Sequence, residues 1–107
     1  MADALIDVPV SVKKGEVFIV KVVLSHIMET GYRRDITGKV IARNIIRRFT
    51  AHYDGTEVFA ADLTQAVAAN PYFGFAVVAG TSGPMVFHWV DDTGVQVRDQ
   101  VLIRVDE

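Results

Sequence analysis

The longest run of apolar positions in this chain covers Glu16–Leu24, where β-branched and aromatic residues follow one another almost without interruption. Residues of these types favour β-strands. After Glu16, one face of the segment is wholly apolar, and the other face is apolar except for Lys21. An antiparallel strand with one solvated face normally alternates between apolar and polar residues. We therefore expect the second face, which includes Ile19, to be covered by another surface.

Other strand-like segments lie on both sides of it in the sequence, and turn residues separate them. Asp54-Gly55 is typical of a tight hairpin turn, and Pro9 restricts the first segment to a sheet edge or a strand entry. Asp62–Ala69 is compatible with one helical turn. Besides Glu16–Leu24, the predicted strands cover Val8–Val12, Val40–Tyr53, Thr56–Ala61, Tyr72–Ala79, Met85–Asp91 and Val95–Val105.

About seven strands with turn signals at short spacing are typical of an antiparallel β-sandwich. The sequence therefore predicts the all-β class and an immunoglobulin-like architecture, with residues 1–107 forming a single domain. Trp89 is expected in the core. The chain contains no cysteine, so it lacks the Cys–Trp–Cys set of antibody domains, and the prediction concerns the architecture alone.

The segment Ser25–Gly38 fits neither a strand nor a helix pattern. It is longer than an ordinary connection of roughly 2–6 residues, and loops on a rigid scaffold often carry function. We expect the Met28 side chain either to fill (plug) the end of the sandwich core or to make an adaptable, polarizable contact with a partner. The other side chains that bring chemistry to this loop are His26, Glu29, Tyr32, Arg33, Arg34 and Asp35.

A second candidate surface begins at Asn70-Pro71, where the chain enters the strand Tyr72–Ala79. Tyr72 falls on the same face of that strand as Gly74 and Ala76. One large ring beside small side chains leaves room for another surface to lie close.

Composition excludes several classes of function. The formal net charge is −2, whereas a nucleic-acid-binding protein needs a basic surface to neutralise phosphates. Without cysteine, the chain has no disulfide, no thiolate metal ligand and no thiol nucleophile of its own. The N-terminus lacks the basic and apolar regions of a secretory signal peptide. No apolar run approaches the ~20 residues of a membrane span.

Catalytic interpretations find little support in the residue pattern. His26 and Glu29 are three residues apart on a segment that is not helical, which matches no metal-binding template. Ser25 and His26 are adjacent, and no nucleophile elbow accompanies them. The pairs Arg33-Arg34 and Arg47-Arg48 are either ordinary solvated charges or a basic surface for an acidic partner. We therefore predict no catalytic residues, no metal and no cofactor.

Five motifs spread over most of the chain resemble the SoxZ family of thiosulfate oxidation. The length of the chain also fits this family. Two positions depart from the pattern, since Ile27 and Ala42 stand where many relatives have proline. The motifs are Ser25-His26-x-Met28-Glu29-Thr30-Gly31-x-Arg33-x-Asp35, Gly38-Lys39-x-Ile41, Ile45-Ile46-x-Arg48-Phe49, Asn70-Pro71-Tyr72-Phe73-x-Phe75 and Trp89-x-Asp91-Asp92-x-Gly94.

The resemblance implies an immunoglobulin-like sandwich that is the non-catalytic subunit of a sulfur carrier. Its expected partner is a SoxY-type subunit, which holds sulfur intermediates on the cysteine of a C-terminal arm. Such complexes work in the periplasm, and the export signal belongs to the partner. The resemblance further implies transient contacts with other Sox enzymes. From the charge and the apolar pattern given above, neither nucleic acid nor a membrane is an expected partner.

On this hypothesis the chain binds partners through its long loop and through the second face of Glu16–Leu24. Two alternatives remain open: a stand-alone immunoglobulin-like binding module unrelated to sulfur, and a small His-dependent hydrolase. The expected partner-binding residues are His26, Met28, Glu29, Arg33, Arg34, Asp35, Tyr72 and Ile19.

Overall fold

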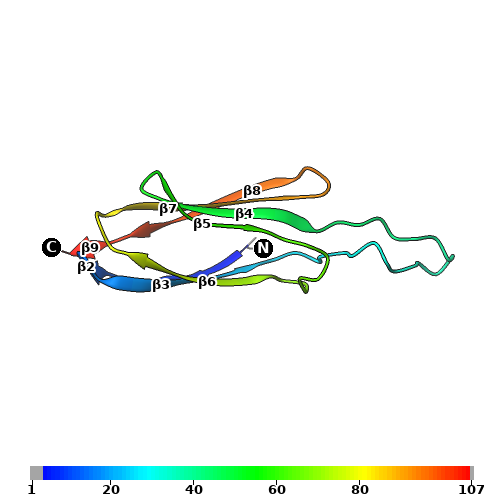
Figure 1. The fold of residues 1–107 in the computed structure, drawn as a ribbon, viewed down its shortest axis with the longest axis horizontal. Helices are drawn as coiled ribbons and strands as arrows, with labels where there is room; N and C mark the ends of the chain where they lie inside the picture. The colour runs from blue at the N-terminus through cyan, green and yellow to red at the C-terminus, as the bar shows by residue number, and fades with distance from the viewer. Residues whose placement is uncertain (1–3, 107) are drawn as a thin grey trace.

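Two antiparallel sheets pack face to face in the computed structural model, which describes residues 4–106 (Figure 1). The first sheet has the strand order β1-β3-β6 and the second the order β5-β4-β7-β8, while β2 pairs in parallel with β9. This arrangement confirms the predicted all-β sandwich. The strands are β1 (Ala4–Asp7), β2 (Val12–Lys13), β3 (Val17–Leu24), β4 (Ile46–Tyr53), β5 (Thr56–Asp62), β6 (Tyr72–Val78), β7 (Gly83–Asp91), β8 (Gln96–Ile103) and β9 (Val105–Asp106).

Aromatic side chains fill the space between the sheets. Phe49 of β4 lies flat against Phe73 of β6, with ring centroids 4.6 Å apart, and Phe59 stacks on Phe75 at the same distance. Offset stacking of this kind adds to the stabilisation from burial. Trp89 is buried, as predicted. These contacts join strands that are distant in sequence and fix how the two sheets face each other.

The β4–β5 hairpin turns at Asp54-Gly55, as predicted. Both residues have positive φ, 48° for Asp54 and 84° for Gly55. Positive φ at both central residues matches the right-handed twist of the flanking strands, and a glycine adopts it without steric cost.

Three local predictions were wrong. Within the predicted segment Asp62–Ala69, Asp62 ends β5 and residues 63–69 form a loop instead of a helical turn, with the Val67 N–H donating to the Thr64 carbonyl at 3.1 Å. A segment this short gains few helical hydrogen bonds against the cost of nucleation. Val8–Val12 is not one strand, because β1 ends at Asp7 and β2 begins at Val12, on either side of Pro9. The predicted strand Val40–Tyr53 begins only at Ile46.

Residues 25–45 form the most conspicuous feature of the molecule, and we refer to them as the arm. The arm connects β3 of one sheet to β4 of the other and projects well beyond the sandwich (Figure 1). It accounts for much of the elongated shape, which measures 61 × 24 × 19 Å. The described residues include no helix long and apolar enough to cross a membrane.

Candidate functional site: the arm and an apolar sheet face

Two isolated β-bridges hold the legs of the arm together. Glu29 and Asn44 exchange backbone hydrogen bonds of 2.8 Å in both directions. Further out, Arg34 bridges Val40. The arm is therefore an extended, twice-bridged hairpin, and its geometry is defined even though little of it forms regular strand.

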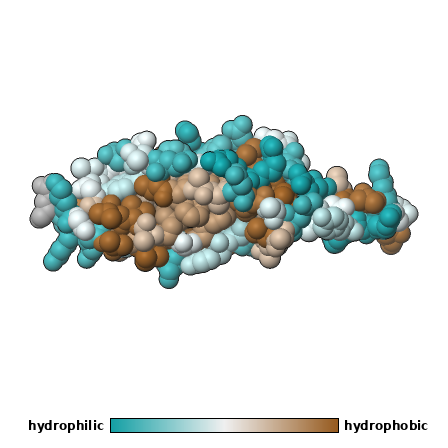
Figure 2. All heavy atoms as spheres, viewed as in Figure 1, coloured by the Kyte–Doolittle hydropathy of each residue, from teal (hydrophilic) through white to brown (hydrophobic). Residues whose placement is uncertain are grey.

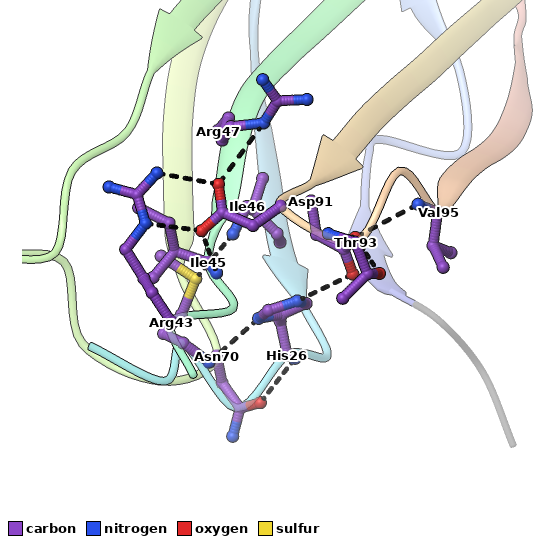
Figure 3. A network of polar contacts seen from close by, with 11 residues as sticks. His26, Arg43, Ile45, Ile46, Arg47, Asn70, Asp91, Thr93 and Val95 are labelled. Atoms are coloured by element: carbon purple, nitrogen blue, oxygen red, sulfur yellow. Dashed lines mark hydrogen bonds and ion pairs between the residues drawn. The ribbon is translucent and has the colours of Figure 1, made fainter. Parts of the chain in front are cut away.

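His26 anchors the outgoing leg at the base of the arm (Figure 3). Its Nδ1 accepts a hydrogen bond from the Met28 N–H at 2.9 Å, and its Nε2 lies 3.3 Å from Oδ2 of Asp91. Because Nδ1 acts as an acceptor, the ring proton resides on Nε2, from which it is donated to Asp91. The main chain of His26 is also tied to Asn70, whose N–H donates to the His26 carbonyl at 2.9 Å.

Asp91 is buried at the end of β7, and its two oxygens contact different partners: Oδ2 faces His26, and Oδ1 faces the turn that leads to β8. Oδ1 accepts hydrogen bonds from the Thr93 N–H, the Thr93 hydroxyl and the Val95 N–H. Burial alone would raise the pKa of Asp91, but the hydrogen bonds from Thr93, His26 and Val95 outweigh it and hold the pKa below its ordinary value. Asp91 is therefore a stable anion that fixes the position of His26.

The neighbouring Asp92 anchors the returning leg through Arg43 and the main chain of Ile45. Arg43 contacts both of its oxygens, with Nε 2.7 Å from Oδ2 and Nη2 2.9 Å from Oδ1. The Ile45 N–H donates to Oδ2 at 3.2 Å, and Arg47 lies 3.5 Å from Oδ1. Burial raises the pKa of Asp92, but Arg43 and the Ile45 amide lower it by more. Two adjacent carboxylates thus clamp the two legs of the arm.

Met28 closes the core beneath this clamp. Its side chain is buried, and its Sδ accepts a hydrogen bond from the Ile46 N–H at 3.3 Å. Met28 also has a φ of 50°, an uncommon value for a residue with a side chain. The structure therefore supports the plug interpretation of Met28.

Further along the arm, Glu29 and Arg33 form an ion pair in which the guanidinium uses Nε and Nη2. Glu29 is buried, whereas the Arg33 side chain is 69% exposed. The hydrogen bond from Arg33 holds the pKa of Glu29 below its ordinary value, so this carboxyl stays ionised. Arg33 is held in one geometry and remains open to a partner.

Asp35 organises the tip of the arm. Its Oδ1 accepts hydrogen bonds from the Thr37 N–H, the Thr37 hydroxyl and the Lys39 N–H, and the bond from Thr37 lowers the pKa of Asp35. Arg34 donates from Nη1 to the Gly38 carbonyl at 2.9 Å. At the apex, Ile36 is fully exposed. Hydrophobic atoms accordingly stand out among hydrophilic ones at the far end of the arm (Figure 2).

The other two expected partner-binding residues, Ile19 and Tyr72, lie away from the arm, on the outer face of the β1-β3-β6 sheet. Ile19 is 50% exposed and Tyr72 60% exposed, and no element of the described chain covers them. The charged residues of this face are Lys21 and Asp7, which lie opposite each other in the β1–β3 register. The exposed large apolar side chains on this face are Leu5, Val17, Ile19, Tyr72 and Val78.

The opposite sheet presents a different outer face. Arg48 of β4 pairs with Asp62 of β5, and His88 of β7 contacts Gln96 of β8 at 3.1 Å. The outer face of this sheet is more polar, although it includes the exposed Leu102, so the β1-β3-β6 face is the better suited to burial against another protein.

The arrangement around His26 offers little for catalysis. Both ring nitrogens are engaged, Nδ1 by the Met28 amide and Nε2 by Asp91, so neither is available as a general base or a metal ligand. Among residues 4–106, no three His, Cys, Asp or Glu side chains gather in a way that could hold a metal ion.

Sequence reasoning found His26 but missed the residues that hold it. Asp91 lies 65 positions further along the chain, and Arg43 falls within a segment predicted to be an ordinary strand. The available signal was the Trp89-x-Asp91-Asp92-x-Gly94 motif, in which two adjacent acidic residues end a buried strand.

Solved structures with the same fold include several superoxide reductases. The superoxide reductase (neelaredoxin) from Ignicoccus hospitalis is 17% identical with a TM-score of 0.76, covering 98% of this chain and 81% of that one. A putative superoxide reductase from Thermotoga maritima is 19% identical with a TM-score of 0.74, covering 97% and 86%. At these identities the likeness concerns the fold alone.

Another neighbour is the sulfur carrier protein SoxY from Chlorobium limicola f thiosulfatophilum. It is 13% identical with a TM-score of 0.71, and the match covers 100% of this chain and 82% of that one. No curated protein sequence matches the chain. The family described as sulphur oxidation protein SoxZ matches residues 6–101, which is most of the sequence. The chain belongs to the SoxZ family.

Proposed function

We propose that this chain is the non-catalytic subunit of a sulfur carrier and pairs with a SoxY-type subunit that bears the sulfur-binding cysteine during thiosulfate oxidation. Membership of the SoxZ family supports this role. The chain has no cysteine with which to hold sulfur itself. The complex works in the periplasm, and the chain is exported together with its partner.

The observation that carries the proposal is the uncovered apolar face of the β1-β3-β6 sheet. A sandwich needs only one buried face per sheet, and the side chains of Val17, Ile19 and Val78 lie outside the core of the folded monomer. Fully burying one such side chain contributes about 1.5–3 kcal/mol. Several of them on one face therefore contribute favourably to association with a partner.

The arm has a different character and supplies a second recognition surface. Arg33 and Arg34 are exposed and held in position by Glu29 and the Gly38 carbonyl. Exposed charges of this kind steer encounters and add specificity more than affinity. We assign to the arm the transient contacts with other Sox enzymes.

The test is reconstitution of the heterodimer. The chain is mixed with the purified SoxY-type subunit, and the Kd is measured for the natural chain, for Ile19→Arg and for Leu102→Arg. Leu102 is equally suited to substitution, since it is 67% exposed, but it lies on β8 of the other sheet. We expect Ile19→Arg to abolish pairing and Leu102→Arg to leave it unchanged. Absence of a complex with the natural chain would refute the proposal.

Two further measurements address the rest of the proposal. Intact mass analysis of the complex from cells grown on thiosulfate should show added sulfur on the partner, removable by reduction, and none on this chain. Fractionation should place this chain in the periplasm only when the partner is also present. If Ile19→Arg instead disrupts a homodimer, the stand-alone binding module becomes the better account.

A further inference from the structure

The β6 strand has one open edge. Its other edge pairs with β3, where the Leu24 N–H donates to the Pro71 carbonyl and the Ala79 N–H donates to the Glu16 carbonyl. In an antiparallel ladder the hydrogen-bonded pairs recur at every second residue. Phe73, Phe75 and Val77 therefore direct their main-chain groups towards β3, and the residues between them direct theirs outward. The outward-directed residues are Tyr72, Gly74, Ala76 and Val78.

This edge lacks the protection that natural sheets usually carry. Edge strands are normally kept apart from other strands by charged residues, prolines, bulges or short length. The β1 edge is four residues long and ends in Asp7, the β5 edge carries Glu57 and Asp62, and the β8 edge carries Arg98 and Asp99. In contrast, the seven residues of β6 include no charge and no proline.

The open edge adjoins the apolar outer face, because the four residues with outward main-chain groups also place their side chains on that face. Three strands about 4.8 Å apart and seven residues at about 3.4 Å each give this face a projected area of about 340 Å². A specific interface takes about 800 Å² from each partner. A partner seated on this face would bury more accessible surface by extending past its border, and the β6 edge is part of that border.

A hollow beside β6 offers room for side chains from an added strand. It has a volume of about 470 Å³ and opens between the edges of β5 and β6, with Val58 and Val77 among its lining residues. Side chains of a strand point alternately to opposite faces. An added strand would place one set over the apolar face and the other set in this hollow.

We propose that β6 accepts an edge strand of the SoxY-type subunit, so that the three-stranded sheet continues into the partner. The inference rests on the proposed function for the identity of the partner. The SoxY neighbour shares the sandwich fold, and a sandwich of this kind has edge strands of its own to offer. Main-chain hydrogen bonds along β6 then supply affinity, and the side chains supply specificity.

The test introduces proline at Ala76. This substitution removes an outward N–H and adds a ring to the open edge, but it leaves the ladder to β3 intact. Ala60→Pro is the matched control, because Ala60 lies on the β5 edge. The Leu63 N–H donates to the Arg47 carbonyl, so Leu63 and every second residue before it direct their main-chain groups towards β4. The main-chain groups of Ala60 therefore point outward. We expect Ala76→Pro to raise the Kd for the purified partner by about tenfold or more. Ala60→Pro should change it less than about twofold.

Amide hydrogen exchange on the unsubstituted chain provides a second measurement that does not depend on the variant folding. The amides of Tyr72, Gly74, Ala76 and Val78 should exchange quickly in the free chain and become protected in the complex. The amide of Ala60 should exchange quickly in both states. Protection of this alternating set in β6 would support strand addition.

The outcomes separate this inference from the proposed function. If Ile19→Arg prevents pairing but Ala76→Pro binds normally and the four amides stay unprotected, the partner docks on the face without adding a strand, and the inference fails alone. If no heterodimer forms at all, the proposed function fails with it. The same amides could also become protected from exchange in the chain alone at high concentration. That result would show that the β6 edge pairs with a second copy of this chain, and it would also overturn the inference.

Discussion

Asp91→Asn tests the clamp at the base of the arm. The substitution keeps Oδ1 for Thr93 and Val95 but replaces Oδ2 with an NH₂ group that faces the Nε2–H of His26. Two donors then oppose each other. If His26 moves its proton to Nδ1 so that Nε2 can accept from the introduced amide, the new Nδ1–H opposes the Met28 N–H. No tautomer of His26 satisfies both contacts, so the variant loses at least one buried hydrogen bond.

The size of the effect follows from that loss. A hydrogen bond to a charged group contributes about 1.5–3 kcal/mol, and an unsatisfied buried donor costs a similar amount. We expect Asp91→Asn to reduce the free energy of unfolding by about 2 kcal/mol. For a domain of this size that corresponds to a fall in Tm of about 8 °C. Thermal and urea unfolding followed by the fluorescence of the single buried Trp89 would measure it.

The effect should also depend on pH. The pKa of Asp91 is lower in the folded chain than its ordinary value, so its ionised form contributes stability at pH values above the pKa of the unfolded chain. That contribution is lost as the pH falls through the folded pKa. The difference between the natural chain and Asp91→Asn should therefore be full at neutral pH and shrink in acid.

Asp62→Asn is the control for this experiment. Asp62 also pairs with a basic residue, Arg48 at 2.8 Å, but its side chain is 78% exposed. Exposed pairs contribute about 0–1 kcal/mol, so this variant should be nearly as stable as the natural chain. Equal losses of stability in the two variants, or no loss in Asp91→Asn, would refute the argument that burial and the contact with His26 make the Asp91 interaction stronger.

Three further predictions concern the arm. Nitrogen NMR of His26 should show a protonated Nε2 and an unprotonated Nδ1 at neutral pH, because Nδ1 accepts from Met28; a protonated Nδ1 would contradict the contact. Met28→Ala should lower the free energy of unfolding by about 2–5 kcal/mol in urea titrations, since it leaves a cavity and removes the acceptor of a main-chain N–H. Gly31→Ala should destabilise the chain more than Gly15→Ala in the same titrations. Both glycines have positive φ, but a Cβ at Gly31 would lie 3.0 Å from the Cβ of Arg43, whereas one at Gly15 meets nothing within 4 Å.

The sandwich could be predicted from the sequence because its signals are local. The apolar run at Glu16–Leu24 identified β3, and Asp54-Gly55 identified a turn whose φ values few other residue pairs adopt. The buried position of Trp89 followed from its place in an alternating strand. Each of these features depends on residues within one element, so the pattern contains the information needed.

The arm could not be predicted in the same way. Its returning leg carries no periodicity, because the leg belongs to no sheet and is held by two isolated bridges and by contacts to Asp92. The contacts that fix its base join His26 to Asp91 and Arg43 to Asp92, across 65 and 49 positions. Neither pairing leaves a local pattern. Long-range side-chain pairs of this kind become visible only once the fold brings the ends of β3 and β7 together.

Salt dependence should distinguish the two proposed binding surfaces. Attraction between exposed charges falls as the Debye length shortens, from about 30 Å at 0.01 M to about 3 Å at 1 M salt, whereas burial of apolar surface does not weaken in this way. Pairing through Ile19 and the β6 edge should therefore persist in high salt, while contacts through Arg33 and Arg34 should weaken steadily. Arg34→Gln should reproduce the high-salt behaviour in low salt without affecting the heterodimer. A heterodimer that dissociates with rising salt would instead place the arm within the permanent interface. The sheet face could then no longer be assigned to the permanent partner and the arm to transient ones.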